Sequence, residues 1–163
     1  MRIACSLGSL LSVEEVLQCT QIISDTKIDS IWIPETWGME NFSMLGAVAN
    51  STNTQKIGSS IINIYSRSPS TIAMGSATID TLSNGRLILG LGTSSVPIVE
   101  DFHGEKFENP VQRMKEYVEI IRLSLMKKQI NYSGKIFDLK NFTLLIEPKR
   151  KSIPIYLAAI NEK

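Results

Sequence analysis

The sequence has few of the features that mark several large classes of protein. Its 163 residues include only two cysteines, Cys5 and Cys19, which are too few for a disulfide framework and are not in a metal-binding spacing. We therefore expect both to be reduced thiols in a cytoplasmic protein. No apolar run reaches the roughly 18 residues that a membrane span requires. The short apolar stretch at the N-terminus is also not typical of a signal peptide.

An excess of charge of one sign is also lacking. The 17 Lys and Arg residues almost balance the 16 Asp and Glu residues, so no broad electrostatic field favours nucleic acid or a membrane as a partner. We interpret the one basic run, residues 149–151, as a solvated loop. The single histidine, His103, shares a loop with Glu100, Asp101 and Glu105. We interpret these side chains as solvated and predict no metal site.

The sequence instead alternates between short apolar segments and amphipathic segments. Ser12 and Glu15 form a capping box at the start of one predicted helix. Ser68 followed by Pro69 begins another helix, and the pair Asn84-Gly85 ends it. Strands are expected at residues 2–7, 30–33, 57–64, 87–91 and 153–158, and two further helices at 42–53 and from 109 onward.

Alternating strands and helices predict a parallel sheet within a single domain spanning residues 1–163. The pattern leaves two closures open, a doubly wound open sheet and a (β/α)₈ barrel, and a complete barrel needs about 250 residues. Two segments interrupt the alternation. Residues 93–108 form a long loop, a kind of segment that is often functional. Residues 130–146 are predicted to form an inserted β-hairpin that turns at Ser133-Gly134.

Polar residues follow two of the predicted strands, where parallel βα folds place their chemistry. Glu35, Thr36 and Trp37 follow the second strand and could hydrogen-bond to and stack on a heterocycle. The alternative for this group is a helix-capping turn with a packed tryptophan. Asn63, at the end of the third strand, offers an amide donor and acceptor. Arg67 would pair either with an anion or with a neighbouring carboxylate.

The fourth predicted strand ends in a glycine-rich segment. Gly90 and Gly92 permit close backbone approach, and the hydroxyl groups of Thr93 and Ser94 suit a phosphate. The segment lacks the third glycine of a dinucleotide-binding fingerprint, and no helix begins directly after it. A Rossmann site is therefore not predicted here.

Taken in order, residues 30–38, 57–69 and 79–93 resemble the luciferase-like monooxygenase superfamily, in particular the N-terminal half of its coenzyme F420-dependent, methylenetetrahydromethanopterin reductase-like branch. The resemblance implies an α/β fold, a (β/α)₈ TIM barrel truncated after about strand five. It also implies an oxidoreductase that transfers hydride between coenzyme F420 and a small organic substrate. This chain alone would be an incomplete version of such an enzyme.

The same resemblance implies a cofactor site at the carboxyl ends of the strands. It implies a strand bulge with a non-prolyl cis peptide bond between Ser60 and Ile61, behind the cofactor ring. Glu35 and Asn63 are the candidates for a catalytic role. The implied cofactor-binding residues are Glu35, Thr36, Ser60, Ile61, Asn63, Thr93 and Ser94, with the last two bounding the substrate or the cofactor tail.

Two departures from the family narrow the function. The branch that oxidises sugar phosphates has a histidine where this chain has Thr36 and a catalytic glutamate where it has Ser95, so we do not expect sugar-phosphate oxidation. One alternative is an FMN-dependent monooxygenase of the same superfamily. Another is an inactive half-barrel, or one that binds a ligand or a partner. Self-association into a homo-oligomer is left open.

Overall fold

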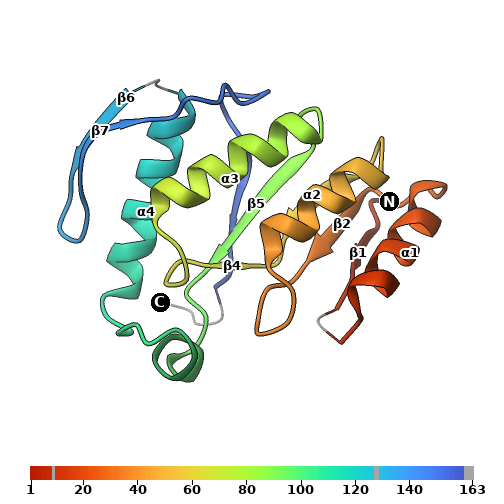
Figure 1. The fold of residues 1–163 in the computed structure, drawn as a ribbon, viewed down its shortest axis with the longest axis horizontal. Helices are drawn as coiled ribbons and strands as arrows, with labels where there is room; N and C mark the ends of the chain where they lie inside the picture. The colour runs from red at the N-terminus through yellow and green to blue at the C-terminus, as the bar shows by residue number, and fades with distance from the viewer. Residues whose placement is uncertain (9, 127–128, 160–163) are drawn as a thin grey trace.

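A computed structural model describes residues 1–8, 10–126 and 129–159. Short parallel strands alternate with longer helices along the chain (Figure 1). In order, the elements are β1 Ala4–Ser6, α1 Val13–Ser24, β2 Ser30–Ile33, α2 Asn41–Ser51, β3 Lys56–Ser59, β4 Ile62–Asn63, α3 Pro69–Leu82, β5 Leu87–Gly92, the π-helix η1 Ile98–Phe102, α4 Pro110–Met126, β6 Gln129–Ser133, β7 Asp138–Thr143 and β8 Ile155–Leu157.

The main sheet has the strand order of a barrel. β1 pairs with β2, β2 with β3, and β5 pairs with both β3 and β4 on one side and with β8 on the other, always in parallel. Helices α1 to α4 all lie on the same side of this sheet (Figure 1). A doubly wound sheet would carry helices on both faces. Of the two closures left open by the sequence, the barrel type is therefore confirmed.

The predicted strand 57–64 is interrupted by a bulge. Gly58 pairs with Ile88 and Ile62 pairs with Leu91, so three residues of one strand lie opposite two of the other. The Ser60–Ile61 peptide bond is cis, as the resemblance implied. Across the bulge, the Ser59 hydroxyl accepts a hydrogen bond from the Gly90 N–H at 2.8 Å and donates one to the Gly90 carbonyl at 2.9 Å.

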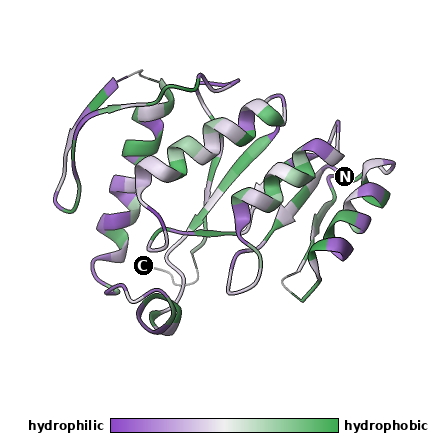
Figure 2. Cartoon of the chain, viewed as in Figure 1, coloured by the Kyte–Doolittle hydropathy of each residue, from purple (hydrophilic) through white to green (hydrophobic). Residues whose placement is uncertain are grey.

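The two faces of the sheet are covered differently. The face toward the helices is a closed apolar core in which Ile31, Ile57 and Leu89 are fully buried, and the strands of this core stand out as hydrophobic in Figure 2. The interior face combines glycines with two large aromatic side chains. Trp32 lies over Gly58, where an added Cβ would meet the indole ring at 2.5 Å. The Trp32 ring centroid is 5.8 Å from that of Tyr156 on β8.

The predicted helix ends agree with the structure. Ser12 and Glu15 form both hydrogen bonds of the capping box that begins α1. Ser68 is the N-cap of α3, and its hydroxyl accepts a hydrogen bond from the Thr71 N–H. After α3, Asn84 and Gly85 both have positive φ angles, of 53° and 82°.

The interpretation of residues 149–151 as a solvated loop was wrong for Arg150. Its backbone N–H, Nε and Nη2 donate to the carboxylate of Asp80 at 2.9, 3.0 and 2.6 Å. Asp80 is fully buried in α3, where an unpaired carboxylate would be costly. Arg150 therefore fastens the segment before β8 to α3.

The predicted hairpin is present as β6 and β7, which pair antiparallel. The buried carboxylate of Glu116 on α4 accepts hydrogen bonds from the backbone N–H groups of Lys135 and Phe137 in the turn, at 2.8 and 3.0 Å. An added Cβ on Gly134 would lie 2.3 Å from Glu116 Oε2, so a larger residue here would displace the carboxylate that binds the turn. Among the described residues, no helix has both the length and the apolarity to cross a membrane.

Candidate functional site

Register brings the predicted site residues to one edge of the sheet. Asn63 pairs with Gly92, and the Ile64 N–H donates to the Gly92 carbonyl at 3.0 Å, so the end of β4 lies beside Thr93. The Ser60 N–H donates to the Ile33 carbonyl at 2.9 Å, which places the bulge beside the end of β2. The carboxyl ends of β2, β4 and β5 therefore meet, as a parallel fold requires.

Among the described residues, three of the six buried side-chain polar atoms that lack a partner lie at this edge: Thr36 Oγ1, Asn41 Oδ1 and Asn63 Nδ2. Asn63 is 4% exposed, and its Oδ1 already accepts a hydrogen bond from the Tyr65 N–H at 2.9 Å. Its Nδ2 is thus a fixed donor without an acceptor. Because unpaired buried polar groups are costly, their presence here points to a ligand.

Arg67 pairs with two carboxylates at the same edge. Its guanidinium binds Glu35 through two hydrogen bonds of 2.6 and 2.7 Å, and it also binds Glu40. We call Glu35, Glu40 and Arg67 the Arg67 cluster. The hydrogen bonds that Arg67 donates to Glu35 raise the pKa of Arg67, although burial acts in the opposite direction. Of the two partners predicted for Arg67, the neighbouring carboxylate is confirmed.

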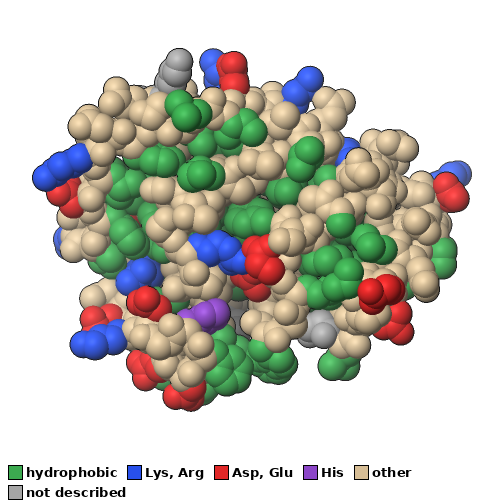
Figure 3. Space-filling view, viewed as in Figure 1, with side chains coloured by type: hydrophobic (Ala, Val, Ile, Leu, Met, Phe, Trp, Pro, Cys, Tyr) green, Lys and Arg blue, Asp and Glu red, His purple; other side chains and the backbone are tan. Residues whose placement is uncertain are grey.

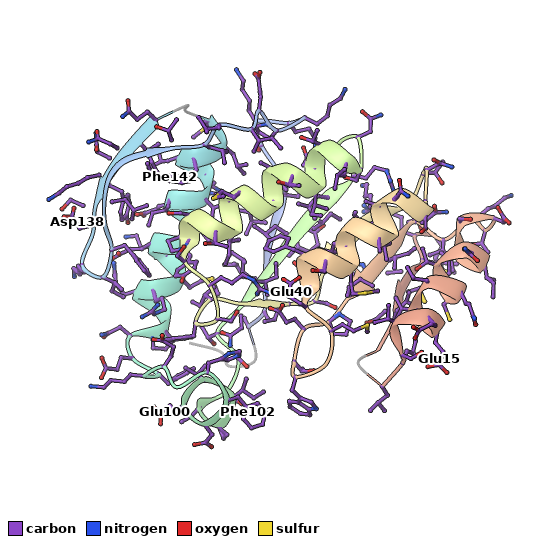
Figure 4. All side chains as sticks on the ribbon, in the orientation of Figure 1. Glu15, Glu40, Glu100, Phe102, Asp138 and Phe142 are labelled. Carbon is purple, nitrogen blue, oxygen red and sulfur yellow. The ribbon has the colours of Figure 1, made fainter. Side chains whose placement is uncertain are left out.

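Glu40 also forms the N-cap of α2. Its carboxylate accepts hydrogen bonds from the Phe42 and Ser43 N–H groups and from the Ser43 hydroxyl. Burial alone would raise the pKa of Glu40, but the hydrogen bonds from Ser43 and Phe42 and the charge of Arg67 lower it. The sequence did not reveal this residue, because glutamate is not among the preferred N-cap residues. Glu40 lies at the start of α2 (Figure 4).

Glu35 has a capping role as well. Its Oε1 accepts a hydrogen bond from the Asn41 N–H at 3.0 Å. The capping turn considered for residues 35–37 is therefore present, but the packed tryptophan is not. Trp37 is 72% exposed and meets Phe102 of η1 edge-on, with ring centroids 5.8 Å apart.

The bulge and β5 form an apolar wall on the interior side. An added Cβ on Gly92 would lie 2.6 Å from the Ile61 side chain, so Ile61 lies directly against the strand. Ser60 is exposed and Ile61 half-buried. Thr93 and Ser94 are half-buried, and Ser94 has a positive φ of 59°. A flat ring could lie against this wall while Asn63 and Thr36 supply hydrogen bonds at its edge.

Other parts of the chain offer less for chemistry. A cavity of about 480 Å³ lies at the opposite, amino ends of the strands, where Asp29, Lys56 and Ile88 are among its lining residues. Within the described ranges, no group of three His, Cys, Asp or Glu residues could hold a metal ion. On the face shown in Figure 3, acidic and basic side chains are interspersed.

Comparison with protein families gives one match that covers the chain. The model of the family described as "Luciferase-like monooxygenase" matches residues 1–163. A Mycobacterium tuberculosis protein named as a coenzyme F420-dependent oxidoreductase, Rv3520c, is 32% identical over 151 residues, covering 85% of this chain and 44% of that protein. The 5,10-methylenetetrahydromethanopterin reductase of Archaeoglobus fulgidus is 36% identical over 144 residues, covering 88% of this chain and 42% of that enzyme.

The fold has close counterparts among solved structures. The coenzyme F420-dependent tetrahydromethanopterin reductase of Methanopyrus kandleri superposes with a TM-score of 0.89 at 23% sequence identity, over 98% of this chain and 50% of that one. This likeness concerns the fold alone. The chain spans less than half the length of the two curated relatives above.

Proposed function

This chain belongs to the luciferase-like monooxygenase family, and from that premise we propose that it forms the ring-binding half of a coenzyme F420-dependent oxidoreductase. The observation that carries the proposal is the pair of unpartnered buried atoms, Asn63 Nδ2 and Thr36 Oγ1, beside an apolar wall. The substrate is a small organic molecule that exchanges hydride with the cofactor.

The residues at this edge fit a deazaflavin ring. Its pyrimidine edge carries carbonyl oxygens, which are suitable acceptors for the Asn63 amide and the Thr36 hydroxyl. Ile61, held against Gly92, would support the back of the ring. When bound, the deazaflavin supplies the hydride chemistry, and the protein supplies orientation and exclusion of water. Ser60 would lie beside the ring, and Thr93 and Ser94 would bound the substrate or the cofactor tail.

Glu35 and Arg67 have positioning roles in this proposal. Both carboxylate oxygens of Glu35 are occupied by Arg67, and Oε1 also accepts from Asn41. Held in this way, the carboxylate fixes the turn that carries Thr36. Asn63, with a free donor toward the ring, is the stronger candidate for contact with the reacting atoms.

The choice of F420 over FMN rests on the relatives. The M. tuberculosis relative is named for coenzyme F420, and the A. fulgidus relative is a methylenetetrahydromethanopterin reductase. FMN has a ring of similar shape, so it serves as the competing ligand in the test.

The proposal is tested by titrating the purified chain with coenzyme F420 and, in parallel, with FMN, followed by ring fluorescence. We expect saturable F420 binding that weakens about five- to tenfold in Thr36→Val and in Asn63→Asp, because each removes one hydrogen-bond donor. Asn63→Asp keeps the oxygen that accepts from the Tyr65 N–H. Thr52→Val, which alters a buried hydroxyl at the other end of α2, is the matched control.

Each outcome of this titration has a definite meaning. Binding of FMN alone would identify a flavin-dependent monooxygenase instead. Binding of neither ring would contradict the proposal for this chain and favour an inactive or partner-binding half-barrel. F420 binding that is unchanged in both variants would remove Asn63 and Thr36 from the site.

A further inference from the structure

Large apolar side chains are exposed on loops that surround the candidate site. Trp37 lies on the loop after β2, and Val96 and Phe102 lie on the segment after β5, with exposures of 72%, 47% and 59%. Figure 3 shows hydrophobic side chains gathered along the lower edge of the molecule, over these loops. Single exposed apolar residues are common on proteins, but a group at the mouth of a site favours ligand contact.

The loop that carries Trp37 is fastened at both ends. Glu35 precedes it and Glu40 follows it, and both carboxylates bind the guanidinium of Arg67. Between these anchors the indole projects into solvent instead of packing into the core. A turn anchored at both ends has fewer conformations to lose when a ligand binds to its exposed apolar group.

Phe102 is held in a similar way. It ends the π-helix η1, whose Val99 is fully buried and anchors the segment to the core. The Glu105 N–H donates to the Val99 carbonyl at 3.1 Å, and the Phe107 N–H donates to Glu100 Oε1 at 3.2 Å. Phe102 lies at the lower edge of the molecule (Figure 4). Short π-helices often occur at functional sites.

We propose that Trp37 and Phe102, which we call the aromatic pair, bind a flat, uncharged aromatic portion of the substrate. This inference rests on the proposed function, since it assigns the substrate side of the same site. Aromatic faces and edges attract flat rings. On the exposed segment that carries Phe102, three carboxylates (Glu100, Asp101 and Glu105) outnumber one ammonium group, that of Lys106, so an anionic substrate is disfavoured.

The test follows the two indole N–H signals of the ¹⁵N-labelled chain by NMR. Trp32 and Trp37 are the only tryptophans, and Trp32 serves as the internal control because its Nε1 donates to Ser30 Oγ. Three probes are added separately: quinazolin-4-one, which is flat and neutral, 2-naphthoate, which is flat and anionic, and cyclohexanol, which is neutral and not flat. Trp37→Ala assigns the signals.

We expect quinazolin-4-one to shift the Trp37 signal saturably and to leave Trp32 in place. Its affinity should fall about fivefold in Phe102→Ala, which removes one ring and keeps the Trp37 signal. 2-Naphthoate and cyclohexanol should bind at least about fivefold more weakly, because one is repelled by the acidic segment and the other cannot stack. Val111→Ala, on an exposed apolar residue of α4, should change nothing.

Coenzyme F420 affinity, measured by ring fluorescence in Trp37→Ala, separates this inference from the proposed function. F420 binding without a Trp37 response to quinazolin-4-one would contradict the role proposed for the aromatic pair and would still support the cofactor site. A Trp37 response without F420 binding would overturn the proposed function and leave a flat-ring site. Equal responses to all three probes would show an unspecific apolar surface and overturn the inference.

Discussion

Two arginines hold the two ends of helix α2, and they do so with different partners. At the amino ends of the strands, Arg86 donates five hydrogen bonds to uncharged oxygens, among them the carbonyls of Ala49 and Thr52 at the end of α2. At the carboxyl ends, Arg67 binds the carboxylates of Glu35 and Glu40 at the start of α2.

This difference in partners suggests different roles, with Arg86 serving stability and Arg67 serving the candidate site. Around Arg86, a cation meets the carbonyl groups at the end of a helix, an arrangement that the helix dipole favours. Around Arg67, the cation is paired with two carboxylates, and Thr36 Oγ1 nearby has no partner; the Arg86 end also has one such atom, Gln55 Oε1. Parallel βα folds use one end of the strands for chemistry and the other for stability, and α2 spans both.

The largest expected effect is on stability at the Arg86 end. Arg86→Met would leave several carbonyl groups without a charged donor and cost about 3 kcal/mol of unfolding free energy. Urea unfolding monitored by circular dichroism measures this loss, with Arg122→Met on the exposed side of α4 as the control. F420 affinity of the folded fraction should stay unchanged. A loss of less than about 1 kcal/mol would contradict the structural role of Arg86.

The equivalent change at the other end of α2, Arg67→Met, should lower the unfolding free energy less than Arg86→Met does and lower the affinity for F420 more. Arg67→Met leaves Glu35, whose side chain is 12% exposed, and the half-exposed Glu40 without their shared cation. Glu35 keeps the hydrogen bond from the Asn41 N–H and Glu40 remains solvated, so we expect about 2 kcal/mol. F420 affinity should fall, because the turn that carries Thr36 is no longer fastened. The double variant Arg67→Met/Glu35→Gln should recover part of the stability. A larger loss of stability in Arg67→Met than in Arg86→Met would contradict the roles assigned to the two arginines.

Low pH should reduce the contribution of the Arg67 cluster to stability and leave the contribution of Arg86 unchanged. The lowered pKa of Glu40 means that its contribution to stability is present above the ordinary value of 4.5 and is lost as pH falls through the folded-state pKa. The effect is below about 1 kcal/mol, because this carboxylate is partly solvated. Urea midpoints of the wild type and Glu40→Gln should differ at pH 7 and converge near pH 3. The stability loss caused by Arg86→Met should be the same at both pH values.

The smallest expected effect is that of Thr36→Val, for which Thr52→Val is the reference. The Thr52 hydroxyl is bonded to Arg86 and to the Val48 carbonyl, whereas the Thr36 hydroxyl has no partner. Thr52→Val should cost about 1 kcal/mol, and Thr36→Val should change stability by less than about 0.5 kcal/mol. Thermal unfolding of both variants checks this difference. An equal cost at both positions would mean that Thr36 is bonded within the protein.

Local chemistry could be predicted from the sequence, and long-range pairing could not. The capping box at Ser12 and the end of α3 at Asn84-Gly85 depend on neighbours within a few residues, and both were found. The pairs of Asp80 with Arg150 and of Glu35 with Arg67 join residues 70 and 32 positions apart. No periodicity marks such partners, so Arg150 was assigned to solvent.

The candidate site was predicted in part. The resemblance indicated the bulge at residues 60–61, and register then brought Asn63 and Thr93 together. The exposure of Trp37 and its contact with Phe102 were missed, because the distance between two loops depends on the whole barrel. The cofactor-binding roles of the seven predicted residues stay predictions until a ligand is measured.

The Ser59 hydroxyl described above also suggests a rule for protein design. It bonds to both the N–H and the carbonyl of Gly90, in a space so narrow that a Cβ on Gly90 would lie 2.0 Å from the Ser59 carbonyl oxygen. A serine opposite a glycine thus takes over the bonds that a regular strand would make through its backbone. A designer who wishes to insert a bulge into a parallel barrel, and so turn a side chain toward the interior, could place this pair beside it.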